Sequence, residues 1–221
     1  MPADAVHKTF RETEVVFANG ARGRPIEIPS ASPAGYHQVL NAPGEMPPQA
    51  IDGKLFLPPG VSSSTRLPLV MVVPGSLGVA PSHVAHAETL NAAGCATFVL
   101  DPFGARGVTS TVANQTQYSF AASAYDVLAA WRVLSALPEI DPDRIGAQGH
   151  SRGGSAVLMA ATRAFADAVL GAGKGLAAVL PAYPWSGHQF LDPSVGATRV
   201  HVLMGDRDEW CSPMQVQGHM Q

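Results

Sequence analysis

A chain of 221 residues is long enough for one well-buried domain and short for two, and its hydrophobic fraction of 46% is typical of a packed globule rather than of a disordered chain. Its formal net charge of −3 provides no basic surface, so we expect no nucleic-acid partner. No apolar run is long enough to span a membrane and residues 1–11 carry no secretory apolar stretch, so we expect a cytoplasmic protein with no membrane partner.

The beginning of the chain is expected to be irregular, because prolines recur through residues 25–48. We therefore predict an irregular segment over residues 1–50, with one short strand at 14–17, packed on a domain formed by residues 51–221. A further strand is predicted at 54–57, where polar and apolar residues alternate. The whole chain is expected to be a single domain.

From residue 67 onward, short apolar runs alternate with helical patterns. We predict strands at 67–73, 96–100, 144–148, 175–180 and 199–204, and helices at 82–93, 120–134, 151–169 and from Ser212 onward. Each connection is long enough to join parallel strands, so the order predicts an α/β fold: a doubly wound, mostly parallel sheet with helices on both faces. In such sheets, functional residues lie at the carboxyl ends of the strands.

The segment Gly149-His150-Ser151-Arg152-Gly153 is the strongest candidate for a catalytic turn. A predicted strand enters it and a predicted helix leaves it, which is the context in which a G-x-S-x-G turn exposes its serine above a sheet. We therefore expect Ser151 to be a nucleophile. The alternative is a glycine-rich turn that holds a phosphate at the helix N-terminus, but the chain carries neither of the common glycine-rich phosphate-binding motifs.

An attacking serine needs donors for the oxyanion that develops on the substrate carbonyl. One expected donor is the backbone N–H of Arg152, directly after the nucleophile. The other is expected from the loop after residues 67–73, where the backbone N–H of Ser76 is our preferred donor and that of Leu77 the reserve.

The acid that orients a catalytic base follows a later strand in this arrangement. Residues 205–209, after the strand predicted at 199–204, contain Asp206 and Asp208. Asp206 lies directly against the turn, whereas Asp208 lies further along the loop and is freer to point across the strand ends. We therefore choose Asp208, with Asp206 as the alternative.

The sequence resembles the dienelactone hydrolase family in five segments that occur in that family's order: VPGSLG (73–78), LDPFGARG (100–107), DPDRIG (141–146), GHSRGG (149–154) and GDRD (205–208). The resemblance implies an α/β-hydrolase fold, and the family's acid position falls on Asp208. Founding members use a cysteine nucleophile, so Ser151 is similar to the serine-using branch, which favours a carboxylic ester or lactone over dienelactone itself. Arg106 resembles a family arginine, which we interpret as structural, with a clamp for a substrate carboxylate as the alternative.

The catalytic histidine has no clear candidate. Only His219 of the eight histidines follows Asp208, and it would lie about 10 Å along the last predicted helix, away from the strand ends. We therefore expect the base beyond Gln221, with His219 as an outside alternative. On this interpretation the last strand and helix of the fold are missing, and the 221-residue chain is an incomplete or very poor hydrolase.

The sequence thus predicts a serine hydrolase that cleaves a small-molecule ester or lactone through an acyl-enzyme. We expect no cofactor and no metal, since Cys95 and Cys211 form neither a disulfide framework nor a convincing zinc site. Two alternatives remain. One is a non-catalytic α/β-hydrolase-fold protein that binds a ligand or partner, and the other is a peptidase of prolyl-oligopeptidase type, which normally carries a propeller that this length does not accommodate.

Overall fold

The structure, a computed structural model, describes residues 9–61, 65–188 and 190–221. Its centre is a seven-stranded sheet in the order β1-β2-β4-β3-β5-β6-β7. The strands are β1 (Arg24–Ala31), β2 (Pro48–Phe56), β3 (Leu67–Val73), β4 (Ala96–Asp101), β5 (Ile140–His150), β6 (Ala178–Ala182) and β7 (Arg199–Val200). The β1–β2 and β2–β4 pairs are antiparallel and all other pairs are parallel, which confirms the predicted sheet.

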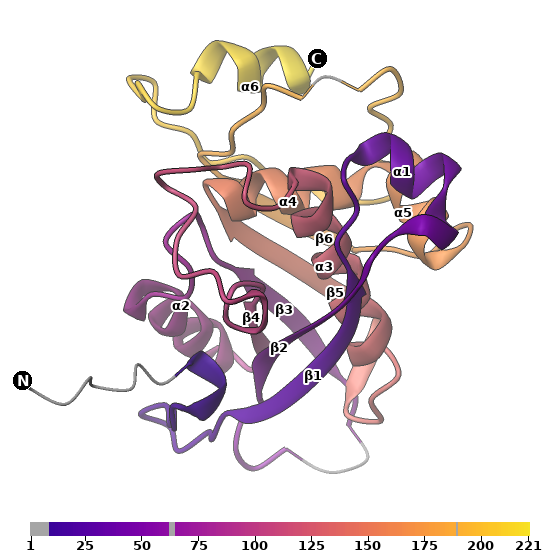
Figure 1. Cartoon of the computed structure of the whole chain (residues 1–221). Helices are drawn as coiled ribbons and strands as arrows, with labels where there is room; N and C mark the ends of the chain where they lie inside the picture. The colour runs from indigo at the N-terminus through magenta and orange to yellow at the C-terminus, as the bar shows by residue number, and fades with distance from the viewer. Residues whose placement is uncertain (1–8, 62–64, 189) are drawn as a thin grey trace, which may run out of the picture.

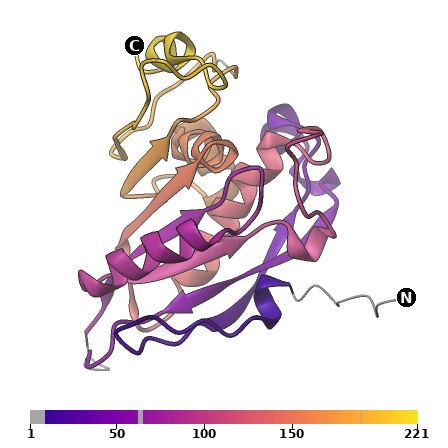
Figure 2. The ribbon, with the colours of Figure 1, turned by 90° about the vertical axis from the view of Figure 1, so that its left-hand side faces the viewer.

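Helices cover both faces of this sheet, as Figures 1 and 2 show. The α-helices are α1 (Tyr36–Asn41), α2 (Pro81–Ala92), α3 (Phe120–Leu134), α4 (Arg152–Ala161), α5 (Arg163–Leu170) and α6 (Pro213–His219), and short 3-10 helices occur at Phe10–Glu12, Pro43–Glu45 and Gly104–Arg106. Helix α2 packs on one face, and α3 and α4 pack on the other. Helix α6 lies beyond the end of the sheet at which the chain leaves β6 and β7 (Figure 1).

The core follows from alternation along the strands, because successive side chains of a strand point to opposite faces. In β3, Met71 belongs to the large cluster under α3 and α4, whereas Val72 belongs to the smaller cluster under α2. In β4, Phe98 and Leu100 join the large cluster and Val99 the smaller one. These strands are therefore apolar on both faces, which is why they appear in the sequence as continuous apolar runs.

The N-terminal segment differs from the irregular structure predicted for residues 1–50. It contains α1 and all of β1, which pairs with β2 from Arg24↔Leu55 to Ala31↔Pro48. Strand β1 is at the edge of the sheet, where prolines are tolerated because an outward-facing nitrogen needs no partner. Pro25 and Pro29 therefore do not break it. The strand predicted at 14–17 is reduced to an isolated bridge between Val16 and Arg22.

Two helix boundaries also differ from the prediction. Helix α2 is capped by Ala80 rather than Ser82, with Pro81 at its first position and the His83 Nδ1 accepting from the Ala80 N–H at 2.9 Å. The helix predicted at 151–169 is divided into α4 and α5 at Thr162, whose hydroxyl donates to the Met159 carbonyl at 2.8 Å. Such a side-chain bond to the backbone competes with helix continuation.

The C-terminal strands are shorter than predicted. Strand β6 begins at Ala178 rather than at residue 175, and β7 covers only Arg199–Val200, followed by a bridge between Ala182 and Leu203. Ser212 caps α6 as expected, since its Oγ accepts from the Gln215 N–H.

Candidate functional site

Ser151 occupies the sharp turn between β5 and α4. Its backbone has φ 52° and ψ −114°, a left-handed conformation that non-glycine residues seldom adopt. The Ser151 N–H donates to the Ala182 carbonyl at the end of β6, at 3.0 Å. A strained serine at a strand-to-helix turn indicates a functional residue, because the surrounding structure must hold it there.

Two glycines make this turn sterically possible. A Cβ on Gly149 would lie 2.1 Å from the Gly153 carbonyl oxygen, and a Cβ on Gly153 would lie 2.4 Å from that of Val73. Both contacts are with backbone, which cannot move aside without displacing β3 or α4. The glycines of the motif are therefore required for close packing around the elbow.

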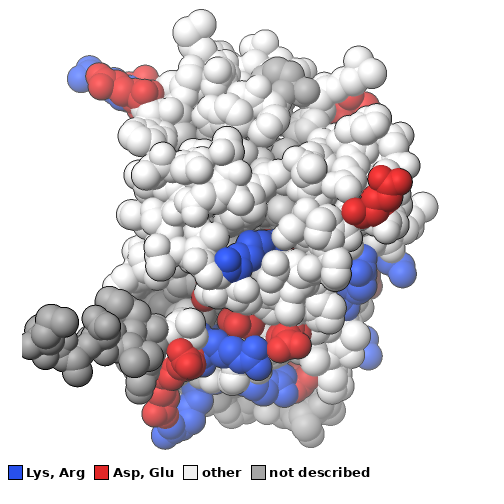
Figure 3. Space-filling view, viewed as in Figure 1, with Lys and Arg blue, Asp and Glu red and all other residues white. Residues whose placement is uncertain are grey.

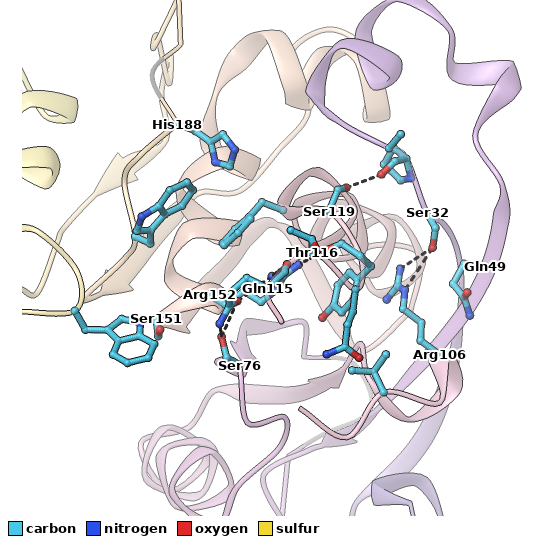
Figure 4. Close-up of a pocket in the computed structure, with 18 residues that line it drawn as sticks. Ser32, Gln49, Ser76, Arg106, Gln115, Thr116, Ser119, Ser151, Arg152 and His188 are labelled. Atoms are coloured by element: carbon cyan, nitrogen blue, oxygen red, sulfur yellow. Dashed lines mark hydrogen bonds between the residues drawn. The ribbon is translucent and has the colours of Figure 1, made fainter. Parts of the chain in front are cut away.

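The loop after β3 brings Ser76 to the same cavity as Ser151. The Ser76 carbonyl accepts from the Thr111 N–H at 2.8 Å, and its hydroxyl is paired with the Gln115 side-chain amide at 3.0–3.1 Å. Ser76 and Arg152 line the cavity, whereas the reserve donor Leu77 is 72% exposed and is not among the lining residues. Figure 4 shows Ser76, Arg152 and Ser151 together at one end of the cavity.

The Arg152 side chain is buried and extensively bonded. Its Nε donates to the Ser123 hydroxyl, and its two terminal nitrogens donate to the Gln115 side-chain and backbone oxygens and to the Tyr118 carbonyl, at 2.6–3.2 Å. Its guanidinium also lies between the rings of Tyr118 and Phe120, 4.4 and 4.3 Å from their centroids. Arg152 therefore fastens the first turn of α4 to the start of α3.

These residues surround a cavity of about 1010 Å³. Its walls carry the aromatic side chains Tyr118, Phe120, Trp185, His188 and Trp210 and several serine, threonine and glutamine side chains. Arg106 and Arg152 are the charged residues among the described residues of the lining, which include no aspartate or glutamate. Figure 3 shows mainly uncharged side chains around the centre of this face.

Asp208 is half-buried in the loop after β7, whereas Asp206 is exposed. The Oδ1 of Asp208 accepts from the backbone N–H groups of Trp210 and Cys211, both at 2.8 Å, which fixes the carboxylate in the turn before α6. Its charge acts on Tyr183 and Cys211, and burial together with this charge raises the pKa of both groups. The preference for Asp208 over Asp206 is therefore consistent with the geometry, and its role in orienting a base stays a prediction.

Cys211 is a buried residue beside the Asp208 carboxylate, and sequence reasoning missed it. Burial and the Asp208 charge raise the pKa of its thiol, and the Ser151 side chain opposes the rise. The available signal was the spacing, because Cys211 follows Asp208 by three residues and thus falls in the same capped turn. Tyr183, directly after β6, also has a positive φ, of 39°.

The described histidines do not complete a triad. His150 packs among His83, His86 and Tyr183, with ring centroids 5.0–6.0 Å away, and burial lowers its pKa. His188 lines the cavity but contacts the rings of Phe120 and Trp185.

His219, in the last turn of α6, lies against the Phe190 ring and the His188 backbone. Among residues 9–61, 65–188 and 190–221, no histidine hydrogen-bonds to Ser151 or Asp208, and His7 lies outside the described residues.

Arg106 forms a buried ion pair that supports the cavity wall. Its guanidinium pairs with both carboxylate oxygens of Asp126 at 2.6 and 3.0 Å, and its remaining N–H groups face Pro102 O, Ala31 O and the Ser32 hydroxyl. All of its donors thus have acceptors within the protein. This is what the structural interpretation of Arg106 requires, and it leaves no donor for a substrate carboxylate.

Membrane-spanning helices and metal-binding clusters are both absent from the described residues. No helix there is long and apolar enough to cross a membrane. The same part of the chain holds no group of three or more histidine, cysteine, aspartate or glutamate side chains placed to bind a metal ion.

Comparisons with known proteins relate the chain to a hydrolase family and its fold to those of known hydrolases. The sequence model of the prolyl oligopeptidase family matches residues 81–201, more than half of the chain. Among solved structures, one named m3DLH is 21% identical (TM-score 0.64; 90% of this chain, 75% of that chain), and a dienelactone hydrolase-like promiscuous phosphotriesterase from metagenomic libraries is 19% identical (TM-score 0.62; 90% and 76%). Dipeptidyl peptidase 4 from Porphyromonas gingivalis is 14% identical (TM-score 0.58; 91% and 30%). These identities show a shared fold, and among curated proteins none matches significantly.

Proposed function

From a chain that belongs to the prolyl oligopeptidase family and has the α/β-hydrolase fold, we propose a serine hydrolase. In this proposal the enzyme cleaves a carboxylic ester or lactone through an acyl-enzyme. The observation that carries the proposal is the strained backbone of Ser151 at the mouth of an aromatic-walled cavity. A serine hydroxyl held above the carboxyl end of a parallel sheet is suited to attack a carbonyl carbon.

In the proposed reaction, the Ser151 Oγ attacks the ester carbonyl and forms a tetrahedral intermediate. The backbone N–H groups of Arg152 and Ser76 donate to its oxyanion, and loss of one such donor costs about 10²–10³ in kcat in a serine protease. Collapse of the intermediate expels the alcohol and leaves Ser151 acylated. Water then attacks the acyl-enzyme and releases the acid.

A base must accept the Ser151 proton, and Asp208 is the group that would orient it. The Asp208 Oδ1 already accepts two backbone N–H groups, and Oδ2 remains for an imidazole N–H. No histidine of the described residues hydrogen-bonds to Ser151 or Asp208, so the proposal gives Asp208 the orienting role and assigns no described histidine as the base.

The peptidase alternative is favoured by the family itself and opposed by the cavity. An exopeptidase that holds a substrate ammonium group needs a carboxylate partner, and the described cavity lining has no aspartate or glutamate. The two functions are tested by comparing the hydrolysis of an ester, 4-nitrophenyl acetate, with that of a peptide-like amide, alanyl-prolyl 4-nitroanilide. The first substrate loses an oxygen leaving group from an acetyl group, and the second loses a nitrogen leaving group from a dipeptide. We expect the ester to be the better substrate.

The variant Ser151→Ala tests the proposal and the non-catalytic alternative together. We expect it to lower ester hydrolysis by several orders of magnitude, since loss of the serine in a protease triad lowers kcat by about 10⁶. The matched control is Ser135→Ala, which removes a hydroxyl that bonds Arg132 O at the far end of α3. Equal activity of Ser151→Ala and wild type would show that the serine is not the nucleophile.

A further inference from the structure

The cavity beside Ser151 is lined by a cluster of aromatic rings in mutual contact. The Phe120 and Trp185 rings lie 5.0 Å apart between centroids, and His188 meets them edge-on at 5.4 and 4.8 Å. Phe120 is the first residue of α3, and Trp185 and His188 belong to the loop after β6. Rings from α3 and from the loop after β6 thus form one wall of the cavity.

This wall is held rigidly against the catalytic turn. The Ser155 hydroxyl, one helical turn after Ser151, donates to the Trp185 carbonyl at 2.7 Å. The Arg152 guanidinium lies 4.3 Å from the Phe120 centroid and is fixed by its bonds to α3 and the preceding loop. Any ligand that reaches Ser151 therefore lies beside rings with fixed orientations.

The rest of the lining is polar, and its two arginines are turned towards protein acceptors. The Arg106 charge is paired with Asp126, whereas Arg152 keeps its positive charge and donates to the neutral oxygens of Ser123, Gln115 and Tyr118. The other polar residues are hydroxyl and amide side chains, such as Gln49, Thr116 and Gln117. A lining of rings, hydroxyls and amides favours a ligand with a flat apolar part, and the absence of an aspartate or glutamate from the described lining disfavours an ammonium group.

The size of the cavity points the same way. Its volume of about 1010 Å³ lies at the upper end of the range of about 300–1,000 Å³ for small-molecule sites. An acetyl or propionyl group would leave most of that space unfilled, whereas an aryl group can contact the Phe120 and Trp185 rings. Ring contacts in offset or edge-to-face geometry add about 0.5–1.5 kcal/mol beyond the burial of area.

We propose that this cavity binds an uncharged aromatic group of the ester, and that Phe120 and Trp185 select it. The proposal rests on the function proposed above, because it concerns the substrate of the same serine. The ring can belong to the acyl part or to the alcohol part of the ester. The proposal predicts that the cavity binds an aromatic ring more tightly than an aliphatic group with the same number of carbon atoms.

Binding of inert analogues tests the selection independently of turnover. Titration calorimetry with N-methyl-3-phenylpropanamide and its cyclohexyl analogue gives the ratio of two Kd values. The two ligands have the same carbon skeleton, with an aromatic six-membered ring in one and an aliphatic ring in the other. A ring contact of 0.5–1.5 kcal/mol corresponds to about twofold to twelvefold tighter binding of the phenyl ligand. We expect Phe120→Leu and Trp185→Leu each to bring this ratio towards one.

The matched control is Phe10→Leu, which removes a ring that packs with the α2-side cluster under Lys54, away from the cavity. This variant should keep the wild-type ratio. If Phe120→Leu does not fold, as judged by circular dichroism, Trp185→Leu decides alone. Equal Kd values for the two ligands in the wild type, or an unchanged ratio in the folded cavity variants, would overturn the proposal.

Kinetics then separate the two positions of the ring. The values of kcat/KM are compared for methyl 3-phenylpropanoate against its cyclohexyl analogue, and for 2-phenylethyl acetate against 2-cyclohexylethyl acetate. A phenyl preference in the first pair places the ring in the acyl part, and a preference in the second pair places it in the alcohol part. Turnover of acetates with no phenyl preference overturns the aromatic selection alone, whereas phenyl-selective binding with no ester turnover contradicts the proposed function alone.

Discussion

Replacing Asp126 with alanine should destabilise the protein strongly, because it leaves a charge unpaired in the interior. The Asp126 side chain is fully buried, and that of Arg106 is 5% exposed. Two guanidinium N–H groups and the Ser30 hydroxyl donate to the Asp126 carboxylate at 2.6–3.0 Å. Burial raises the pKa of Asp126, and Arg106 opposes this rise, so the carboxylate depends on its partner to stay ionised.

The expected loss is about 3–5 kcal/mol in the free energy of unfolding, the range for removal of one partner from a buried ion pair. For a chain of 150–250 residues, each kcal/mol lowers Tm by about 2–4 °C, so Tm should fall by about 6–20 °C. The double variant Arg106→Met with Asp126→Leu removes both charges and keeps apolar volume. It should recover most of the loss, because the main cost is the unpaired guanidinium rather than the absent attraction.

Urea unfolding followed by circular dichroism measures these differences at constant m. The control is Asp141→Ala, which removes the partner of Arg144 in an exposed pair and should change the unfolding midpoint far less. A loss below about 1 kcal/mol for Asp126→Ala would refute the reasoning. A double variant as unstable as the single one would show that the pair itself, and not the unpaired cation, determines the stability.

The remaining predictions concern the site and one remote carboxylate. Asp208→Asn should lower ester kcat more than Asp206→Asn does, with the loss of about 10⁴ seen for the orienting acid of a protease as the upper bound; a more damaging Asp206 change would contradict the choice of acid. Free imidazole should accelerate ester hydrolysis by the 221-residue chain but not by Ser151→Ala, and abolition of activity by His219→Ala would instead make His219 the base. Burial and the Asp101 carboxylate raise the pKa of Asp52 from 3.8 to about 6, so the folded state loses stability as the pH rises from about 4 through 6. Asp52→Asn should remove that loss, up to about 3 kcal/mol for two pKa units and less where solvent reaches the carboxylate, in urea unfolding at pH 4 and pH 8; equal pH dependence of the two proteins would contradict it.

The central strands and their order of connection could be predicted because their apolar runs are long and are separated by helical patterns. Strand β1 could not, since prolines usually exclude strands and only its place at the sheet edge makes Pro25 and Pro29 tolerable. The division of α4 from α5 was missed because Thr162 stops the helix through a bond of its own hydroxyl, which depends on a rotamer and not on residue type alone.

The site was predictable in its backbone features and less so in its side-chain partners. The glycines around Ser151 follow from the geometry of a sharp turn, whereas the choice of Asp208 rests on its position in the loop after β7 and stays a prediction. The rings of Phe120 and Trp185 come to the same cavity as Ser151 only through tertiary packing, which no local sequence pattern indicates, and the spacing of Cys211 from Asp208 was the one signal for that residue. Arg106 was interpreted as structural from the sequence, and its complete set of protein acceptors agrees.

The most direct test of the account is covalent labelling of Ser151 by a fluorophosphonate. Only an activated serine with oxyanion donors reacts quickly with such a probe, because phosphorylation follows the same attack as acylation. We predict one adduct per chain by intact-protein mass spectrometry, mapped to the peptide that contains Ser151, and none for Ser151→Ala. An adduct on another residue, or labelling of Ser151→Ala at the wild-type rate, would contradict the account.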